Sequence, residues 1–260
     1  MIYEHNLNPI VIEIFSLKIY WYSLAYIFGF LFCLHYSKFL IRKKILKVNH
    51  EILENFITWS ILAVLLGGRI GYVIFYNIEF YLEFPSEIIK VWKGGMSFHG
   101  GLIGIIILMI LFSKVKKIDF KVIANLVCYT CPFGIFLGRI ANFINAELIG
   151  KPTNGSWGVV YKNETFPRHP SQIYEAIFEG LLIFLILYFF SRSKLINKFN
   201  VYAIFLVLYG LFRFNLEFFR EPDSHLGYII YGLSMGQILS IPMFVFGIIF
   251  LTYGKKKQNL

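Results

Sequence analysis

The sequence has 260 residues, of which 57% are hydrophobic and only 15% are charged, and its mean hydropathy is +0.65. A soluble domain carries about 25% charged residues, so this composition excludes an ordinary soluble protein. The formal net charge of +10 would suit nucleic-acid binding. The basic residues lie in short clusters between apolar stretches, however, so we expect no nucleic-acid partner. The composition indicates an all-α integral membrane protein.

The first residues, 1–16, contain no basic stretch followed by an apolar core and a small-residue cleavage site, so we expect an arm rather than a cleaved signal peptide. Stretches of about 20 apolar residues cross a bilayer core of ~30 Å. Seven such stretches follow: Leu17–Leu40, Ile52–Asn77, Gly95–Phe112, Phe120–Asn145, Ser171–Phe190, Val201–Phe219 and Leu233–Gly254. We therefore predict a seven-helix membrane domain over 17–254 that includes an outer loop or cap at 146–170, and a basic cytoplasmic tail at 255–260.

The distribution of Lys and Arg predicts the orientation, because cytoplasmic loops are enriched in basic residues. Fifteen basic residues lie at or after the ends of the first, third, fifth and seventh stretches, whereas seven lie on the opposite side. We therefore expect the N-terminus outside and the C-terminus in the cytoplasm. The remaining three basic residues, Arg69, Arg139 and Arg213, lie inside predicted helices.

In this orientation, polar residues of all seven helices gather near the outer membrane face. They are Tyr22, Arg69, His99, Arg139, Gln172, Glu175, Arg213, Ser234 and Gln237. A charge inside a membrane helix costs ~2.5–3.5 kcal/mol on insertion scales. Snorkelling to the headgroups would explain one arginine, but it explains less well three arginines at one depth beside acidic residues. This level is therefore our candidate functional site.

The helix that carries Arg139 places further polar groups beside it. The spacing puts Arg139, Asn142 and Ala146 on one helical face, and Glu147 follows at the helix end. This face thus carries an arginine and one amide, and the helix end adds a carboxylate.

A second stripe contains Tyr209, Arg213 and Glu217, which are spaced four residues apart. This spacing predicts an Arg213–Glu217 ion pair. Arginine binds phosphate through paired, charge-assisted hydrogen bonds, and the predicted depth is that of lipid headgroups. A phospholipid entering from the bilayer is therefore the natural substrate.

Glycines surround His99 and line two predicted helices. The pairs Gly67/Gly71 and Gly100/Gly104 have the spacing of close helix packing, and we expect them to pack. A membrane histidine often serves only as a hydrogen-bonded core residue, but His99 is predicted to face the arginine level, where it could accept or relay a proton.

The cysteines do not indicate chemistry. Cys128 and Cys131 lie in an apolar run without adjacent polar ligands, so we expect small buried residues rather than a redox or zinc site. We expect no metal and no cofactor. The sequence also lacks the Gly-x-Ser-x-Gly motif of lipases.

Three other classes of membrane protein compete with an enzyme. A transporter should carry polar groups along its whole path, but the inner halves of these helices are nearly bare. A retinal photoreceptor needs a lysine in the last helix, and Leu233–Gly254 has none. A structural lipid-binding protein stays open, and an activity assay separates it from an enzyme.

Six motifs together resemble the prolipoprotein diacylglyceryl transferase family in order and sequence. They are GGRIGYVIFYN (Gly67–Asn77), GGMSFHGG (Gly94–Gly101), GRIANFINAELIG (Gly138–Gly150), RHPSQIYE (Arg168–Glu175), YGLFRFNLEFFREPD (Tyr209–Asp223) and SMGQILSIPM (Ser234–Met243). The outer loop between Gly150 and Arg168 is shorter than in many members.

The resemblance implies the reaction, the partners and the location. The diacylglyceryl group of phosphatidylglycerol would pass to the lipobox cysteine thiol of a preprolipoprotein signal peptide, forming a thioether and releasing glycerol phosphate. Because the attacking sulfur belongs to the substrate, the protein's own cysteines would not be needed. The resemblance implies a multi-pass protein of the bacterial inner membrane with its active site toward the periplasmic face.

The resemblance also implies roles for the residues of the predicted cluster. Arg139 would clamp the lipid phosphate as the departing oxygen gains charge, and Arg213 would assist while Glu217 orients it. Asn142 and Glu147 would line the same pocket.

Aromatic and basic side chains complete the implied site. Tyr22 and Tyr209 would supply hydroxyl groups, and His99 would be the base. A free thiol has a pKa of ~8.5, so either His99 or the field of the arginines would have to activate it, and the sequence leaves both open. Arg69, at the same predicted level, is a further candidate for substrate binding.

Overall fold

The structure is a computed structural model that describes residues 2–15, 17–162, 164–193, 199–222 and 227–253. The predicted basic tail at 255–260 lies outside the described residues. So do Lys194 and Lys198, two of the basic residues that follow the fifth predicted stretch. The chain forms two compact units, one made of Met1–Cys33 and Val127–Leu260, the other of Leu34–Leu126. The assignment of 1–16, 17–254 and 146–170 to an arm, a membrane domain and a cap stays a prediction.

The prediction of seven apolar helices is confirmed. Seven helices of the described chain are long and apolar enough to cross a membrane, and the short β-strand pairs form no closed sheet. The helices are α1 (Trp21–Arg42), α2 (His50–Tyr76), α4 (Phe98–Lys116), α5 (Phe120–Ile144), the continuous α6–η3–α7 (Ser171–Arg192), α8 with η5 (Val201–Phe219) and α9 (Met235–Tyr253). Each predicted stretch overlaps one of them. The protein is therefore a multi-pass membrane protein.

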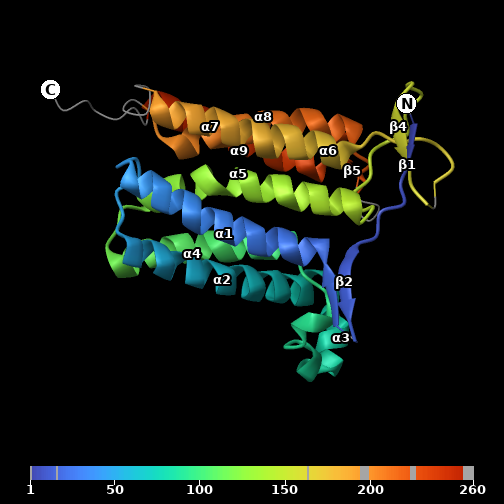
Figure 1. The fold of residues 1–260 in the computed structure, drawn as a ribbon, viewed down its shortest axis with the longest axis horizontal. Helices are drawn as coiled ribbons and strands as arrows, with labels where there is room; N and C mark the ends of the chain where they lie inside the picture. Colours follow the sequence, from blue (N-terminus) through green and yellow to red (C-terminus); the bar gives the residue numbers. More distant parts are fainter. Residues whose placement is uncertain (1, 16, 163, 194–198, 223–226, 254–260) are drawn as a thin grey trace. The chain divides into compact units, whose positions relative to one another are not determined.

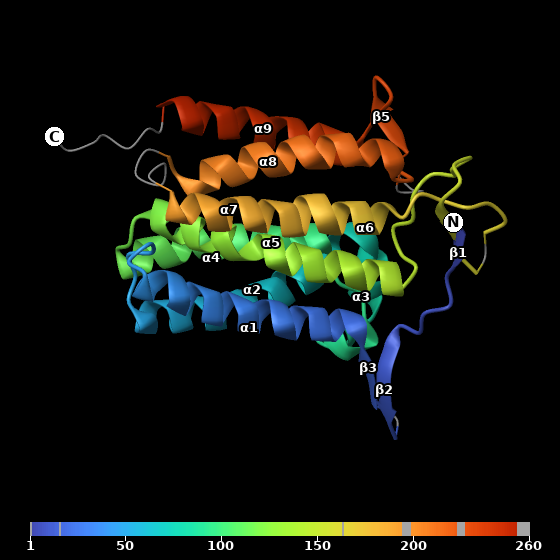
Figure 2. The same cartoon turned by 45° about the horizontal axis from the view of Figure 1, so that its top comes forward.

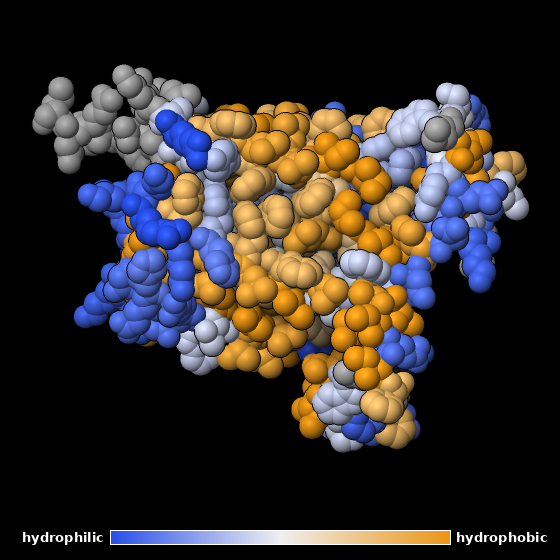
Figure 3. All heavy atoms as spheres, viewed as in Figure 1, coloured by the Kyte–Doolittle hydropathy of each residue, from blue (hydrophilic) through white to orange (hydrophobic). Residues whose placement is uncertain are grey.

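Apolar side chains cover the helices on the face that is drawn in Figure 3. Phe75, Leu66 and Phe189, for example, are 69%, 61% and 64% exposed. Side chains of this kind would be an aggregation hazard in water, whereas lipid tails solvate them without cost.

In the first unit, the N-terminal boundary of the first helix differs from its prediction. Residues Leu17–Tyr20 form strand β3, which pairs antiparallel with β2 (Ile10–Ile14). Helix α1 therefore begins at Trp21 rather than Leu17. The β-branched Ile19 and the aromatic Tyr20 favour a strand here, and hydropathy alone does not separate such a strand from the start of a helix.

Two further strand pairs lie at one end of the helices of the first unit (Figure 1). Strand β1 (Ile2–Glu4) pairs in parallel with β4 (Gly158–Val160), which joins the N-terminal arm to the 146–170 segment. Strands β5 (Tyr228–Ile230) and β6 (Leu233–Ser234) form a hairpin immediately before α9. Its two central residues, Tyr231 and Gly232, have positive φ angles of 51° and 72°, as a tight type I′ turn requires.

Helices α8 and α9 lie side by side along their length in the same unit (Figure 2). Gly210 of α8 allows this approach, because a Cβ there would lie 2.8 Å from the backbone nitrogen of Phe244 in α9. The packing places the end of α8 next to the start of α9.

In the second unit, α2 and α4 pack closely, and the predicted glycine pairs form their interface. A Cβ at Gly67 or Gly71 would overlap backbone atoms of Gly100, and one at Gly104 would overlap Ala63. The prediction that these glycines serve packing is confirmed.

Local signals set the ends of α2 and α4. The Asn49 side chain accepts a hydrogen bond from the Ile52 amide at 2.7 Å, and Ser97 accepts one from Gly100 at 3.1 Å. Helix α4 therefore starts at Phe98, three residues later than predicted, since Gly95 has a φ of 77°. Between α2 and α4 lie the short helix α3 (Ile78–Glu83) and the 3-10 turns η1 (Pro85–Glu87) and η2 (Val91–Lys93).

Candidate active site

Two arginines from different helices of the first unit share one buried pair of carboxylates. Arg139 of α5 approaches Glu175 at 3.0 Å and Glu179 at 3.3 Å. Arg213 of α8 approaches the same carboxylates at 2.9 and 3.3 Å. Both glutamate side chains are fully buried, whereas the arginine side chains keep 15% and 11% exposure. The structure thus brings Arg139 and Arg213 together, as predicted.

A third arginine and a third glutamate extend this network. Arg220, which follows η5 (Glu217–Phe219), lies 3.5 Å from Glu175 and is buried. Arg213 also pairs with Glu217 across one helical turn, so the predicted Arg213–Glu217 pair is confirmed. We call these six residues the ion network: Arg139, Glu175, Glu179, Arg213, Glu217 and Arg220. Breaking a buried pair of this kind costs ~3–5 kcal/mol, because one charge is left without its partner.

The start of α9 holds Glu217 from the other side. The Ser234 hydroxyl donates to the Glu217 carboxylate at 2.9 Å, and Ser234 also accepts from the Gln237 amide at 3.3 Å. A Cβ at position 236 would lie 2.6 Å from a carboxylate oxygen of Glu217, so glycine there leaves room for this carboxylate. The β5–β6 hairpin therefore fixes the geometry of the ion network by placing Ser234.

A π-helical segment presents both shared carboxylates. Glu175 ends α6 (Ser171–Glu175), and Glu179 lies within the π-helical segment η3 (Ala176–Leu182), which continues into α7 (Ile183–Arg192). The wider turn of a π-helix changes the direction of the side chains that follow it, and such segments occur frequently at functional sites. Here the two side chains point to the same two guanidinium groups.

The end of α5 holds Asn142 and Glu147 together, as predicted. The Asn142 amide donates to the Glu147 carboxylate at 3.1 Å, and Asn145 donates to the same carboxylate at 3.3 Å. The expected helical position of Ala146 is wrong, because α5 ends at Ile144 and Ala146 has a φ of 55°. The Glu147 amide instead donates back to the Asn142 carbonyl at 3.0 Å, which closes the helix end.

The segment after α5 is anchored to α6 by hydrogen bonds. Fully buried Gln172 donates to the Glu147 carbonyl at 2.6 Å and accepts from the Tyr161 hydroxyl at 3.1 Å. Burial raises the pKa of Tyr161 to about 12, so this hydroxyl keeps its proton at physiological pH. Arg168 donates to the Gly150 carbonyl at 2.9 Å. Glu147 and Tyr161 are thus tied to the helix that carries Glu175.

Two tyrosines were predicted at the site. Tyr209 stacks on Phe205 with ring centroids 5.6 Å apart and lies within electrostatic range of Glu179 and Arg213, so it borders the ion network. Tyr22 lies in the first turn of α1, with its ring 5.5 Å from that of Tyr26. A role for Tyr22 at the network stays a prediction.

The two remaining predicted site residues belong to the second unit. His99 is exposed in the first turn of α4, with its ring 5.7 Å from that of Phe98. Its placement at one site with Arg139 stays a prediction.

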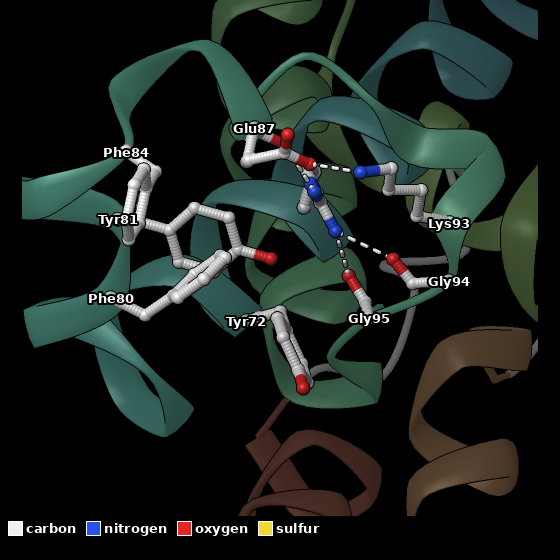
Figure 4. A pocket seen from close by; sticks show the side chains of 9 residues that line it. Tyr72, Phe80, Tyr81, Phe84, Glu87, Lys93, Gly94 and Gly95 are labelled. Atoms are coloured by element: carbon white, nitrogen blue, oxygen red, sulfur yellow. Dashed lines mark hydrogen bonds and ion pairs between the residues drawn. The ribbon is translucent and has the colours of Figure 1, made fainter.

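Arg69 organises the loop between α2 and α4, of which Glu87, Gly94 and Gly95 are labelled in Figure 4. Its guanidinium donates to the carbonyls of Ile88 at 2.8 Å, Glu87 and Gly94 at 2.6 Å, and Gly95 at 3.0 Å, so its donors point to backbone oxygens. The guanidinium carbon also lies 5.1 Å from the centre of the Tyr81 ring.

A pocket of about 450 Å³ opens beside this arginine. It is lined by Arg69, Tyr72, Phe80, Tyr81, Phe84, Glu87, Lys93, Gly94 and Gly95. Glu87 pairs with Lys90 at 2.6 Å and Lys93 at 2.7 Å, and these hydrogen bonds hold the pKa of Glu87 below its usual value. The pocket therefore has an aromatic wall and a charged rim.

Comparison with known proteins adds the family. The family model of prolipoprotein diacylglyceryl transferase matches residues 9–253. The chain belongs to the prolipoprotein diacylglyceryl transferase family. Two similar relatives, each named phosphatidylglycerol–prolipoprotein diacylglyceryl transferase, come from Ehrlichia ruminantium (strain Welgevonden) and Rickettsia felis. The first is 45% identical over 98% of this chain and 100% of the relative, and the second 46% over 93% and 95%.

For this family member, sequence reasoning missed two residues of the ion network. Glu179 did not stand out, although an acidic residue inside an apolar stretch, four positions after Glu175, is the kind of intramembrane charge that marks a site. Arg220 directly follows the predicted helix Val201–Phe219, and only the turn at η5 brings it back to Glu175.

Proposed function

We propose that this chain transfers the diacylglyceryl group of phosphatidylglycerol to the thiol of the lipobox cysteine in preprolipoproteins. The relatives' names state, for those proteins, diacylglyceryl transfer with phosphatidylglycerol and prolipoprotein. The convergence of Arg139 and Arg213 on one partly accessible site carries the proposal for this chain. These two guanidinium groups come from different helices, and the remaining exposure of their side chains leaves donors for an incoming phosphate.

The arginines would bind the phosphodiester of the lipid headgroup. As the glyceryl carbon–oxygen bond breaks, negative charge collects on the phosphate oxygen, and positioned guanidinium groups stabilise that charge. Glu217, which pairs with Arg213 and accepts from Ser234, would orient Arg213. Asn142 and Glu147 would line the same pocket at the end of α5.

The nucleophile would be the sulfur of the peptide. It would bond to the glyceryl carbon as the bond from that carbon to the phosphate oxygen breaks. The thiol proton would pass to His99, or leave under the positive field of the arginines, and finally reside on glycerol phosphate. Tyr22 and Tyr209 would contribute hydroxyl groups, and Arg69 would support binding from the second unit. No cofactor is needed for this exchange of bonds.

The topology follows from the basic loops. We place the N-terminus outside and the C-terminus in the cytoplasm of the bacterial inner membrane, with the ion network toward the periplasmic face. The apolar helix surfaces and the family support this location.

A direct assay tests the proposal. The purified full chain in detergent would be incubated with phosphatidylglycerol and a synthetic lipobox peptide, and the peptide mass would be measured. We expect a mass gain of one diacylglyceryl group, resistant to thioester-cleaving hydroxylamine. A peptide with serine in place of cysteine is the control and should stay unmodified. Binding of the lipid without any product would instead indicate a structural lipid-binding protein.

A further inference from the structure

The ion network has no surplus positive charge for an anionic lipid. It contains three arginines and three glutamates, and every guanidinium lies within 3.5 Å of a carboxylate. The phosphodiester of phosphatidylglycerol brings one more negative charge to this site. A buried charge without compensation is strongly disfavoured in a low-dielectric interior. Binding must therefore be accompanied by a compensating change.

We propose that phosphatidylglycerol binding is coupled to the uptake of one proton by the Glu179 carboxylate, which rests on the function proposed above. The proton comes from water through the buffer and forms an O–H bond on the carboxylate. The network then stays neutral with the phosphate bound. A carboxylate only accepts hydrogen bonds, whereas the neutral acid also donates one. Charged Glu179 competes with the phosphate for the guanidinium groups. Protonated Glu179 can instead donate a hydrogen bond to the phosphate.

The contacts identify Glu179 as the carboxylate that takes the proton. Glu175 is held by three arginines, two of them at 2.9 and 3.0 Å. Glu217 is held by Arg213 and by the Ser234 hydroxyl. Among the described residues, Glu179 contacts Arg139 and Arg213, each at 3.3 Å, and these are the longest contacts that the two arginines make with the carboxylates of the network. The attraction of Glu179 to the two guanidinium groups is therefore the weakest.

The other groups that face Glu179 also favour its protonation once the lipid is bound. Arg139 approaches it from α5, and Arg213 and Tyr209 from α8, while Glu175 lies one turn away on its own helix. A phosphate on these arginines would weaken their support of Glu179, and Glu175 already repels a second negative charge. Both effects favour the neutral acid when the lipid is bound.

Isothermal titration calorimetry measures the proton directly. Short-chain phosphatidylglycerol would be titrated into the purified full chain in detergent, without a thiol acceptor, at one pH in PIPES, HEPES and Tris. The dependence of the heat on the buffer's ionisation enthalpy gives the number of protons taken up. We expect about one proton per lipid bound, and a dissociation constant that rises about tenfold per pH unit.

Single substitutions identify the group that takes up the proton. Glu179→Gln mimics the neutral acid, so it should bind the lipid with about zero proton uptake and little dependence on pH. Glu221→Gln is the matched control, because Glu221 pairs with Arg168 outside the network and is 48% exposed. It should keep the uptake of about one proton.

The possible outcomes separate the two proposals. Lipid binding to the wild-type chain without proton uptake would overturn the coupling and leave the proposed function standing. Uptake that persists in Glu179→Gln would overturn the assignment to Glu179. No binding of phosphatidylglycerol at any pH would overturn the proposed function as well. The wild-type titration decides the coupling even where the variant does not fold.

Discussion

Gly180 of the π-helical segment lies directly against Phe136 of α5, and a Cβ at position 180 would be 2.6 Å from the Phe136 Cα. This contact brings η3 and α5 together where one carries Glu179 and the other Arg139. Replacing glycine by alanine inside a helix usually favours the helix. At this position it would instead force the two helices apart.

We therefore expect Gly180→Ala to destabilise the protein by about 1–3 kcal/mol through overpacking and to lower transferase activity by separating Arg139 from Glu179. Thermal unfolding in detergent and the peptide-modification rate measure the two effects. Gly134→Ala is the control, because a Cβ there meets nothing within 4 Å. Equal behaviour of the two variants would show that the Gly180–Phe136 contact does not set the site.

Arg139→Lys tests the phosphate clamp with the charge retained. A lysine ammonium cannot make the paired, planar hydrogen bonds of a guanidinium, so we expect transfer to fall by about 10²-fold or more. The rate of peptide modification at saturating phosphatidylglycerol is the measurement. Arg42→Ala, at the exposed end of α1, should retain normal activity. A normal rate for Arg139→Lys would exclude Arg139 as the clamp.

His99→Gln tests whether His99 is the base that accepts the thiol proton. Because His99 is exposed, the substitution should change stability by less than about 0.5 kcal/mol, and a loss of activity would then report chemistry rather than unfolding. We expect the rate at pH 7 to fall by about 10²-fold if His99 accepts the thiol proton. The control is His50→Gln, at the exposed start of α2. A near-normal rate would leave the arginine field as the activator of the thiol.

The double variant Cys128→Ser, Cys131→Ser tests whether the protein's own thiols take part. Cys128 is buried, and Cys131 lies one helical turn further along α5. We expect activity within about twofold of the wild type, since surrounding apolar packing keeps such thiols inert. An inactive but folded double variant would contradict this expectation.

His169 predicts how stability depends on pH. Its ring lies among Trp157, Tyr174 and Phe219, and burial lowers its pKa below the ordinary value of 6.5. The folded state thus disfavours the charged ring, so the stability from neutral His169 is present above pH ~6.5 and is lost as the pH falls through the lower folded pKa.

Melting temperatures in detergent between pH 7.5 and 5 would measure this effect. Wild type should lose stability toward pH 5, whereas His169→Gln should lose less over the same range. His50→Gln, which removes an exposed imidazole, should follow the wild type. A wild-type slope in His169→Gln would assign the acid sensitivity to another group.

Much of this architecture is predictable because the membrane constrains it. Apolar length located all seven helices, and the glycine spacing located the α2–α4 contact. The misplaced boundary at Leu17–Tyr20 arose because a strand and a helix start have the same hydropathy, and only pairing with β2 distinguishes them. Long-range pairing leaves no local signal in one sequence.

The candidate site was predictable in part for the same reason. Arginine within an apolar stretch is conspicuous, so Arg139 and Arg213 were found, and the i, i+4 spacing gave the Arg213–Glu217 pair. The role of Glu179 depends on the π-helical turn of η3. The hydrogen bonds from Arg69 to backbone carbonyls depend on the fold of the loop between α2 and α4. Neither is encoded in a periodic pattern.

The parallel pairing of β1 with β4 has a consequence for biogenesis. Residues Ile2–Glu4 leave the ribosome long before their strand partner, Gly158–Val160, which is synthesised only after four of the seven membrane-spanning helices. Strand β1 therefore has no hydrogen-bonding partner while those helices insert. We expect a bulky fusion at the amino terminus to hinder the late pairing of β1 with β4, so a purification tag is better placed at the carboxyl end.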